Sequence, residues 1–371
     1  MNSKYQPFFQ DFSFSDKLML KNRIVMASMT NFSSNEDGTV SKAELDYYRV
    51  RSKGVSMVIT ACTYVTANGK GFPGEFAGHA DDMIESLALL ASAIKEEGAK
   101  AVLQIFHGGR SCPPELVPNG ELVSASNVAQ DPLPAPRPLT EEEIGEIIKA
   151  FGLTTKRAIE AGFDGVEIHG ANGYLLQQFF SPHTNRREDK WGGSLENRLA
   201  FPLAVVREVK HTVEKHAKDP FIVGYRFSPE EPETPGITMT ETYGLIDALV
   251  NENLDYLHVS VQDFWSKPRR GVDASKSRIE WITERVAGRV PVIGVGSIYT
   301  PADALKAFET NISLLALGRE LIIDPEWVQK VQAGNEHQIV IEIDKERQEE
   351  LVIPSPLWNA IISSPGWFPG I

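Results

Sequence analysis

Cysteine is scarce in this chain, whose 371 residues contain only Cys62 and Cys112. Iron–sulfur clusters are usually held by four cysteine thiolates, so two thiols exclude such a cluster. The two positions also lack the close pairing of cysteines that is typical of zinc sites. We therefore expect no metal site and a pair of reduced thiols, as in cytosolic proteins.

Long apolar runs and an excess of positive charge are absent too. No stretch approaches the roughly 18 apolar residues of a membrane-spanning helix, and residues 1–17 lack the apolar core of a signal peptide. Lys and Arg number 37 against 50 Asp and Glu, a formal net charge of −13. Such a surface repels phosphate backbones and anionic membranes. We expect a cytoplasmic protein that acts on a small molecule, with neither a nucleic acid nor a membrane as partner.

The chain does contain a regular alternation of apolar runs and helical patterns. The runs lie at 23–28, 56–65, 100–106, 164–169, 221–227, 255–260, 290–296 and 312–318. Most are continuous, which is typical of parallel strands covered on both faces. Helix start signals lie between them, including a capping box at Thr140 and Glu143 and a Thr300–Pro301 pair.

Eight strands alternating with helices predict an α/β protein of the (β/α)8 TIM-barrel class. The alternative is a doubly wound open sheet. No Gly-x-Gly-x-x-Gly follows an early strand, and the nearest match, at 294–299, is late and lacks the third glycine. The pattern therefore favours the barrel.

We assign residues 1–334 to one barrel and residues 335–371 to a C-terminal tail. The long loops 107–139 and 228–240 follow strands, so they are expected at the active-site mouth, either as stiff surface loops or as lids. The tail begins with an acidic, helix-prone run and ends with two tryptophans among prolines. Tryptophans so near a terminus predict packing on the barrel or on a second subunit, which would make a homo-oligomer.

The ends of the last two predicted strands suggest a phosphate site. Gly296 and Gly318 would let backbone N–H groups approach phosphate oxygens, and a helix N-terminus would add partial positive charge. Ser297 and Arg319 follow these glycines, and a guanidinium forms charge-assisted hydrogen bonds with phosphate. The alternative is a pair of tight turns with Arg319 in a surface ion pair.

Polar residues at other strand ends point to a reaction centre. His169 and Asn172 could aim two donors at one oxygen, which makes a carbonyl more electrophilic, and Tyr174 could give a proton. Arg226 lies in an apolar strand and requires an anionic or strongly polar partner, in a ligand or in a structural salt bridge. Gln104 also lies in a predicted barrel strand, where its amide must pair.

The segment HGANGYLLQQFFSPHTNRREDKWGGSLENR (169–198) closely resembles the signature of the Old Yellow Enzyme family of FMN-dependent NADH:flavin oxidoreductases and ene-reductases. LKNRIVMASMT (20–30), LQIFHGGR (103–110), YRFS (225–228) and LGRELIIDP (317–325) extend the resemblance in family order. It implies a stand-alone, single-domain barrel that binds FMN noncovalently at its mouth and uses NAD(P)H as reductant.

Roles for individual residues follow from this resemblance. It implies that His169 and Asn172 bind the substrate oxygen and that Tyr174 is the proton donor. The implied FMN contacts are Ser28, Met29, Thr30, Cys62, Gln104, Arg226, Gly296, Ser297, Gly318 and Arg319. Among these, Gln104 would contact the pyrimidine edge of the flavin and Arg226 the region of N1 and O2.

The chain departs from the family pattern in three places. Ser28 stands where many relatives have proline, and Trp191 replaces the usual tyrosine of the signature. Phe32 stands where some relatives have a substrate-contacting tyrosine, so the substrate pocket would lack one hydroxyl. These departures bear on substrate preference more than on flavin binding.

The expected reaction is reduction of an electron-poor alkene conjugated to a carbonyl or nitro group. Three alternatives stay open at this stage. The same barrel could pass electrons from NADH to oxygen, a quinone or free flavin, or could bind flavin without catalysis. It could also modify tRNA, although the net charge of −13 argues against this.

Overall fold

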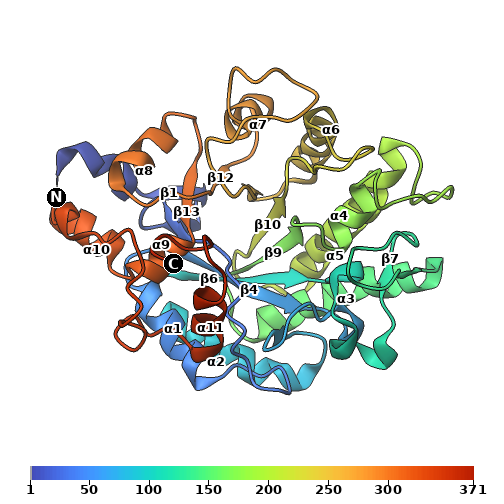
Figure 1. Cartoon of the computed structure of the whole chain (residues 1–371), viewed down its shortest axis with the longest axis horizontal. Coiled ribbons are helices and arrows are strands. Elements are labelled where there is room, and N and C mark those ends of the chain that lie inside the picture. The colour runs from blue at the N-terminus through green and yellow to red at the C-terminus, as the bar shows by residue number, and fades with distance from the viewer. Residues whose placement is uncertain (1) are drawn as a thin grey trace.

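Residues 2–371 are described by a computed structural model in which eight parallel strands form a closed barrel (Figure 1). Strand β3 pairs with both β13 and β4, so the first and last barrel strands are joined. The barrel strands are β3 (Ile24–Met26), β4 (Met57–Tyr64), β6 (Lys100–Phe106), β9 (Gly165–Gly170), β10 (Ile222–Phe227), β11 (Tyr256–Val259), β12 (Val292–Gly294) and β13 (Leu314–Leu317). The prediction of a (β/α)8 barrel is confirmed.

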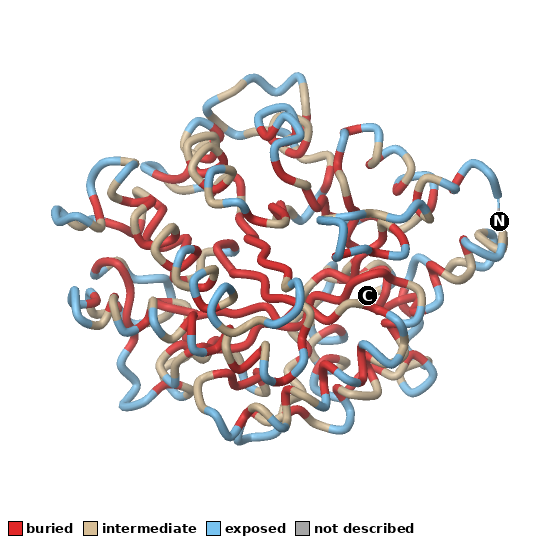
Figure 2. The backbone as a smooth tube through the Cα atoms, turned by 180° about the vertical axis from the view of Figure 1, so that it is seen from behind, coloured by how far each residue is buried: buried red, intermediate tan, exposed pale blue. Residues whose placement is uncertain are grey.

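Helices surround the barrel, and buried residues are concentrated in the strands and on the inner faces of these helices (Figure 2). The helices are α1 (Lys42–Ser52), α2 (Ile84–Lys95), α3 (Glu141–Glu160), α4 (Leu175–Phe180), α5 (Leu195–His216), α6 (Met239–Leu249), α7 (Arg278–Val286), α8 (Pro301–Phe308), α9 (Arg319–Ile323), α10 (Trp327–Ala333) and α11 (Ser355–Ile362). None of the helices within residues 2–371 is long and apolar enough to cross a membrane.

Local capping explains where several helices begin. Thr140 accepts a hydrogen bond from the Glu143 N–H, and the Glu143 carboxylate accepts one from the Thr140 N–H, so the predicted capping box of α3 is confirmed. Thr300 caps α8 and Pro301 is its first residue, also as predicted. These contacts satisfy N–H groups that a helix leaves without partners.

An N-terminal hairpin packs on one end of the barrel interior. Strands β1 (Phe12–Ser15) and β2 (Leu18–Leu20) pair antiparallel. Leu18 and Leu20 are buried in the same apolar cluster as inward residues of the barrel such as Met57 and Ile293. The apolar interior therefore belongs to this end, and polar groups are concentrated toward the carboxyl ends of the strands.

Strand register brings the predicted polar residues into one layer. Gln104 of β6 lies opposite Glu167 of β9. Arg226 of β10 lies between His169 of β9 and His258 of β11. Because neighbouring residues in register point to the same side of a sheet, these side chains converge inside the barrel.

The loop at 107–139 contains the short strands β7 (Val123–Ser124) and β8 (Arg137–Pro138), and β5 (Phe76–Ala77) extends the main sheet beside β4. The division into barrel and tail stays a prediction, but the contacts of the tail are defined. Arg51 of α1 is buried, stacks on Tyr47 and donates to the carbonyl oxygens of Leu351 (2.7 Å) and Val352 (3.3 Å).

The prediction of helix in the acidic run at 341–350 is wrong. The run forms turns and is mostly exposed, with Ile343 its one buried residue. An isolated helix needs an apolar face to pack, because helix propensity alone gives little stability in water. The helix of the tail forms instead at α11, where Leu357 and Ile361 are buried.

Candidate functional site

His169, at the end of β9, is held as a neutral hydrogen-bond donor. Its side chain is 4% exposed, and its Nδ1 accepts a hydrogen bond from the Ala171 N–H at 3.2 Å. Burial, together with the nearby Arg226 charge, lowers the pKa of His169 to about 3. With Nδ1 acting as acceptor, the ring hydrogen resides on Nε2, which is free to donate to a substrate oxygen.

Asn172 has its amide oriented by two serines that we did not predict. Its backbone has φ of +58°, and its N–H donates to Ser228 Oγ at 2.8 Å. Its Oδ1 accepts from Ser260 Oγ at 2.9 Å and from Ser228 Oγ at 3.3 Å. The Nδ2 group is therefore the end of the amide that is left to donate. The available signal was that Ser228 directly follows the predicted strand 221–227 and that Ser260 is the last residue of the predicted strand 255–260.

Tyr174 lies among aromatic rings. Its ring centroid is 4.6 Å from that of Phe106, 5.0 Å from that of His169 and 6.1 Å from that of Phe72, all edge-on. Burial raises the pKa of Tyr174 well above its usual value, so the hydroxyl keeps its proton. We call His169, Asn172, Tyr174, Phe72 and Phe106 the β9 cluster.

Phe32 borders the β9 cluster from the segment after β3. Its ring lies 5.8 Å from that of Phe72, and its backbone has φ of +55°. A bulky residue with positive φ is strained, and such strain is often found at functional sites. Phe32 therefore lies against Phe72 at the edge of the β9 cluster, and its contact with a substrate stays a prediction.

A buried carboxylate lies beneath the β9 cluster. Glu167 is fully buried and accepts hydrogen bonds from Gln104 Nε2 (2.7 Å), Tyr256 OH (3.1 Å) and His258 Nδ1 (2.8 Å). Burial by itself raises the pKa of Glu167, but His258 and Arg226 outweigh it and lower the pKa to about 2. Glu167 and His258 were also not predicted, although both interrupt apolar strands.

Gln104 is fixed by contacts at both ends of its amide. Its Oε1 accepts a hydrogen bond from Ser28 Oγ at 2.8 Å, while its Nε2 donates to Glu167. One amide hydrogen and one lone pair remain for a ligand. Ser28, the residue that departs from the family's proline, therefore supplies a hydrogen bond that proline cannot make.

Arg226 has an unmet donor. Arg226 is 8% exposed, and among residues 2–371 its side chain makes one hydrogen bond, from Nη1 to the Ser28 carbonyl at 3.5 Å. Within residues 2–371 its Nε has no hydrogen-bond partner. A buried guanidinium stays charged and costs free energy when its donors are unpaired, so this arrangement fits an acceptor-rich ligand at the mouth.

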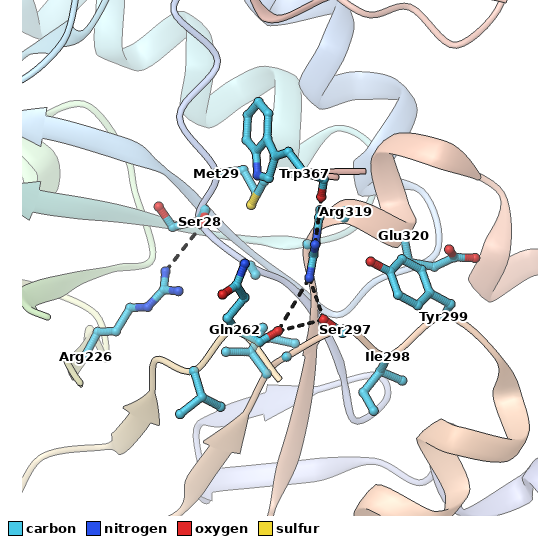
Figure 3. A pocket seen from close by; sticks show the side chains of 16 residues that line it. Ser28, Met29, Arg226, Gln262, Ser297, Ile298, Tyr299, Arg319, Glu320 and Trp367 are labelled. Atoms are coloured by element: carbon cyan, nitrogen blue, oxygen red, sulfur yellow. Dashed lines mark hydrogen bonds between the residues drawn. The ribbon is translucent and has the colours of Figure 1, made fainter. Parts of the chain in front are cut away.

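A pocket at the ends of β3, β12 and β13 brings seven of the predicted FMN contacts together (Figure 3). These seven are Ser28, Met29, Arg226, Gly296, Ser297, Gly318 and Arg319. Gln104, Thr30 and Cys62 do not line it, nor do the residues of the β9 cluster. Gln262 and Trp367 line it without having been predicted.

The glycine and serine after β12 form a backbone cradle. Gly296 has φ of +140°, and a Cβ there would lie 2.6 Å from the Phe264 nitrogen. Ser297 has φ of +49°. No backbone carbonyl within residues 2–371 accepts from the N–H of Ser297 or Gly318. Free N–H groups in such a turn are suited to binding an anion.

Arg319 adds positive charge beside this cradle. Its Nη2 donates to Ser297 Oγ at 2.5 Å and lies 3.5 Å from the Gln262 carbonyl oxygen, while its Nη1 donates to the Trp367 carbonyl at 2.7 Å (Figure 3). We call Gly296, Ser297, Gly318, Arg319 and Gln262 the β13 cluster. Its free N–H groups and guanidinium fit the phosphate of FMN, and the unmet donor of Arg226 fits a flavin ring beside it.

Cys62 lies behind the site, against Thr30 and the carboxyl group of Glu75. Burial raises the pKa of Cys62 and raises that of Glu75 to about 8. Glu75 Oε2 accepts from the N–H groups of Gly71 (2.7 Å) and Phe72 (3.1 Å). Both Cys62 and Cys112 are free thiols and buried.

Sequence comparisons agree with this geometry. The model of the "NADH:flavin oxidoreductase / NADH oxidase family" matches residues 7–338. Over 369 residues the chain is 56% identical to the "Probable NADH-dependent flavin oxidoreductase YqiG" of Bacillus subtilis (strain 168), which covers 100% of this chain and 99% of that protein. It is 44% identical over 352 residues to the "NADH:acrylate oxidoreductase" of Vibrio harveyi, covering 93% of this chain but only 35% of that longer protein.

Comparison with solved structures finds the same barrel. The structure of morphinone reductase in complex with tetrahydroNAD superimposes with a TM-score of 0.77 at 25% sequence identity. The match covers 88% of this chain and 91% of the morphinone reductase chain.

Proposed function

Since this chain belongs to the NADH:flavin oxidoreductase / NADH oxidase family, and is thus an FMN-dependent oxidoreductase that uses NADH or NADPH, we propose that it reduces electron-poor alkenes. The substrate class would be alkenes conjugated to a carbonyl or nitro group. The observation that carries the proposal is the β9 cluster, in which the oriented amide of Asn172 lies three positions along the turn from His169, whose neutral ring lies beside the protonated Tyr174.

FMN, when bound, would supply a hydride carrier that is reduced by NAD(P)H and gives hydride to the β-carbon of the alkene. The β13 cluster would hold its phosphate, and Arg226 and Gln104 would contact its ring. Arg226 would also balance negative charge on the ring, because its guanidinium stays protonated at any working pH.

His169 Nε2 and Asn172 Nδ2 would donate hydrogen bonds to the acceptor oxygen of the substrate. Both donors are neutral, so they would polarise the carbonyl without placing a further positive charge beside it. The hydrogen bonds from Ser228 and Ser260 hold the Asn172 amide in the orientation that this role requires.

Tyr174 would give its proton to the α-carbon of the alkene. The raised pKa of its hydroxyl keeps the proton available throughout the physiological range. The rings of Phe72 and Phe106 pack edge-on against the Tyr174 ring and would hold the hydroxyl in place for this transfer.

The test compares, under anaerobic conditions, the rates at which the flavin absorbance recovers with and without cyclohexenone. Purified protein should be yellow, lose its visible absorbance with NADH, and recover it when cyclohexenone is added. Recovery that is no faster with cyclohexenone than without it would refute alkene reduction. Recovery with oxygen, a quinone or free flavin alone would support the second candidate, an NADH oxidase or flavin reductase, which the family description also covers. Bound FMN that NAD(P)H cannot reduce would indicate a non-catalytic flavin-binding protein.

A further inference from the structure

Trp367 is the one residue of the C-terminal tail that lines the pocket at β12 and β13. The other fifteen of the sixteen lining residues come from the barrel strands, the loops that follow them and the first turn of α9. In Figure 3 the indole of Trp367 lies beside Met29, at the opposite side of the pocket from Ile298. A segment that is distant in sequence therefore closes one side of the site.

The segment carrying Trp367 is held by one buried side chain in the core and by hydrogen bonds within the tail. Phe368 is 1% exposed and belongs to the main apolar core. The Pro369 carbonyl accepts from the Ile343 N–H at 2.9 Å, and the Trp367 N–H donates to the Ser364 carbonyl at 3.0 Å. Phe368 therefore anchors the segment to the core, and the two hydrogen bonds fix its conformation within the tail.

The carbonyl of Trp367 also orients the charged group of the β13 cluster. It accepts from Arg319 Nη1, while Ser297 Oγ accepts from Nη2, so the guanidinium is held from two directions. Within residues 2–371 no carboxylate lies within ion-pair distance of Arg319. The neighbouring carboxyl of Glu320 is buried, and burial raises its pKa to about 10, so it remains neutral. The charge of Arg319 is therefore left for an anion.

We propose that residues 363–371 form the outer wall of the FMN phosphate site, with Trp367 packing against the cofactor and its carbonyl orienting Arg319. The inference rests on the proposed placement of FMN in this pocket. Binding of the cofactor and docking of the tail are then coupled, and the coupling is reciprocal: each stabilises the other by the same free energy.

The test measures the release of FMN from the holoenzyme. After dilution, the fluorescence of released FMN reports the dissociation rate for wild type, Trp367→Ala and Trp358→Ala. Trp358 is the matched control, because it is a half-buried tryptophan of the same tail that does not line the pocket. Loss of one well-packed aromatic side chain costs about 1.4 kcal/mol or more, so release from Trp367→Ala should be about tenfold faster. Trp367→Phe keeps a ring at the site and should restore most of the retention.

A second measurement addresses the tail itself. Amide hydrogen exchange of residues 363–371 should be slower in the FMN-bound protein than after removal of FMN. Equal release rates for Trp367→Ala, Trp358→Ala and wild type, or equal exchange with and without FMN, would overturn the role of the tail and leave the proposed function intact. Purified wild-type protein without any bound FMN would overturn the proposed function and this inference together.

Discussion

The β9 cluster and the β13 cluster lie at the same rim of the barrel but differ in the kind of donor group that each one uses. The β9 cluster surrounds His169 and Tyr174 with aromatic rings, and burial displaces the pKa values of both. Each cluster has an exposed member, Asn172 in the first and Gln262 in the second, but the β13 cluster builds its contacts from backbone groups and one permanent charge.

This difference matches two separate tasks, which are proton transfer to the substrate and binding of the cofactor. A proton donor needs its pKa set by its surroundings, and exclusion of water achieves that. An anion site needs donors whose charge or hydrogen does not depend on pH, and backbone N–H groups with arginine provide these even beside solvent. We therefore expect mutations in the β9 cluster to change rates and mutations in the β13 cluster to change cofactor binding.

The largest expected effect is that of Tyr174→Phe. Loss of the proton donor should slow reoxidation by an enone about 10²- to 10⁴-fold, while reduction by NADH changes little, because that step needs no proton from Tyr174. Stopped-flow spectra of the two half-reactions give both rates. Tyr243→Phe, in a half-buried tyrosine of α6, is the control. Equal loss in both half-reactions would show that the hydroxyl has a structural role.

Asn172→Ala should lower alkene reduction by about 10²-fold, because it removes one of the two donors to the substrate oxygen. FMN content should be unchanged, since Asn172 does not line the pocket at β13. Asn251→Ala, at an exposed position after α6, is the control. Unchanged turnover of Asn172→Ala would refute its assignment to the substrate oxygen.

Gly296→Ala tests the β13 cluster by measuring the affinity for FMN, where the two previous variants are tested by reaction rates. A Cβ at φ of +140° would meet the Phe264 nitrogen, and such strain costs about 1–3 kcal/mol, so FMN should bind about tenfold more weakly or worse. Gly288→Ala is the matched control, because Gly288 also has positive φ but a Cβ at that position would have nothing within 4 Å. If FMN-saturated Gly296→Ala also lost the alkene step specifically, the separation of the two clusters would fail.

Ser260→Ala should have a smaller effect of about fivefold on kcat, because one neutral hydrogen bond to Asn172 contributes about 1 kcal/mol. Ser260→Thr keeps the hydroxyl and should restore the rate. Steady-state kinetics with an enone measure both variants. A loss that threonine does not restore would point to packing at Ser260 in place of orientation of the amide.

The smallest effect concerns the pH dependence of stability. Burial raises the pKa of Glu75 from 4.5 to about 8. The contribution of Glu75 to the free energy of unfolding is therefore fully present below pH 4.5 and is lost as the pH rises through 8. Lys70, Cys62, Tyr64, Cys112 and Tyr174 are the titratable groups around it. Glu75→Gln cannot ionise, so its Tm should exceed that of wild type by a margin that grows by a few degrees between pH 5 and pH 9.

Thermal melts across this pH range provide the measurement. Glu85→Gln, in an exposed glutamate of α2, should follow wild type at every pH. Parallel melting curves for Glu75→Gln and wild type would show that Glu75 ionises in the folded protein as it does in the unfolded chain.

Some of the site was predictable because it is local. His169, Asn172 and Tyr174 lie within six positions at the end of a continuous apolar strand, so their closeness in the fold follows from their closeness in the sequence. Gly296 and Ser297 are equally local. The residues that we missed act across the barrel: Ser228 and Ser260 reach Asn172 from 56 and 88 positions away.

The amino-acid pattern alone determined the number and order of the barrel strands, since continuous apolar runs and helix caps are short-range signals. It also located the polar groups at the strand ends. Only the tertiary structure decided which way those groups face, that Glu167 balances Arg226 beneath the mouth, and that Trp367 completes the pocket beside Arg319. The reason is that orientation, burial and pairing depend on closure of the barrel, which brings together side chains that are remote along the chain.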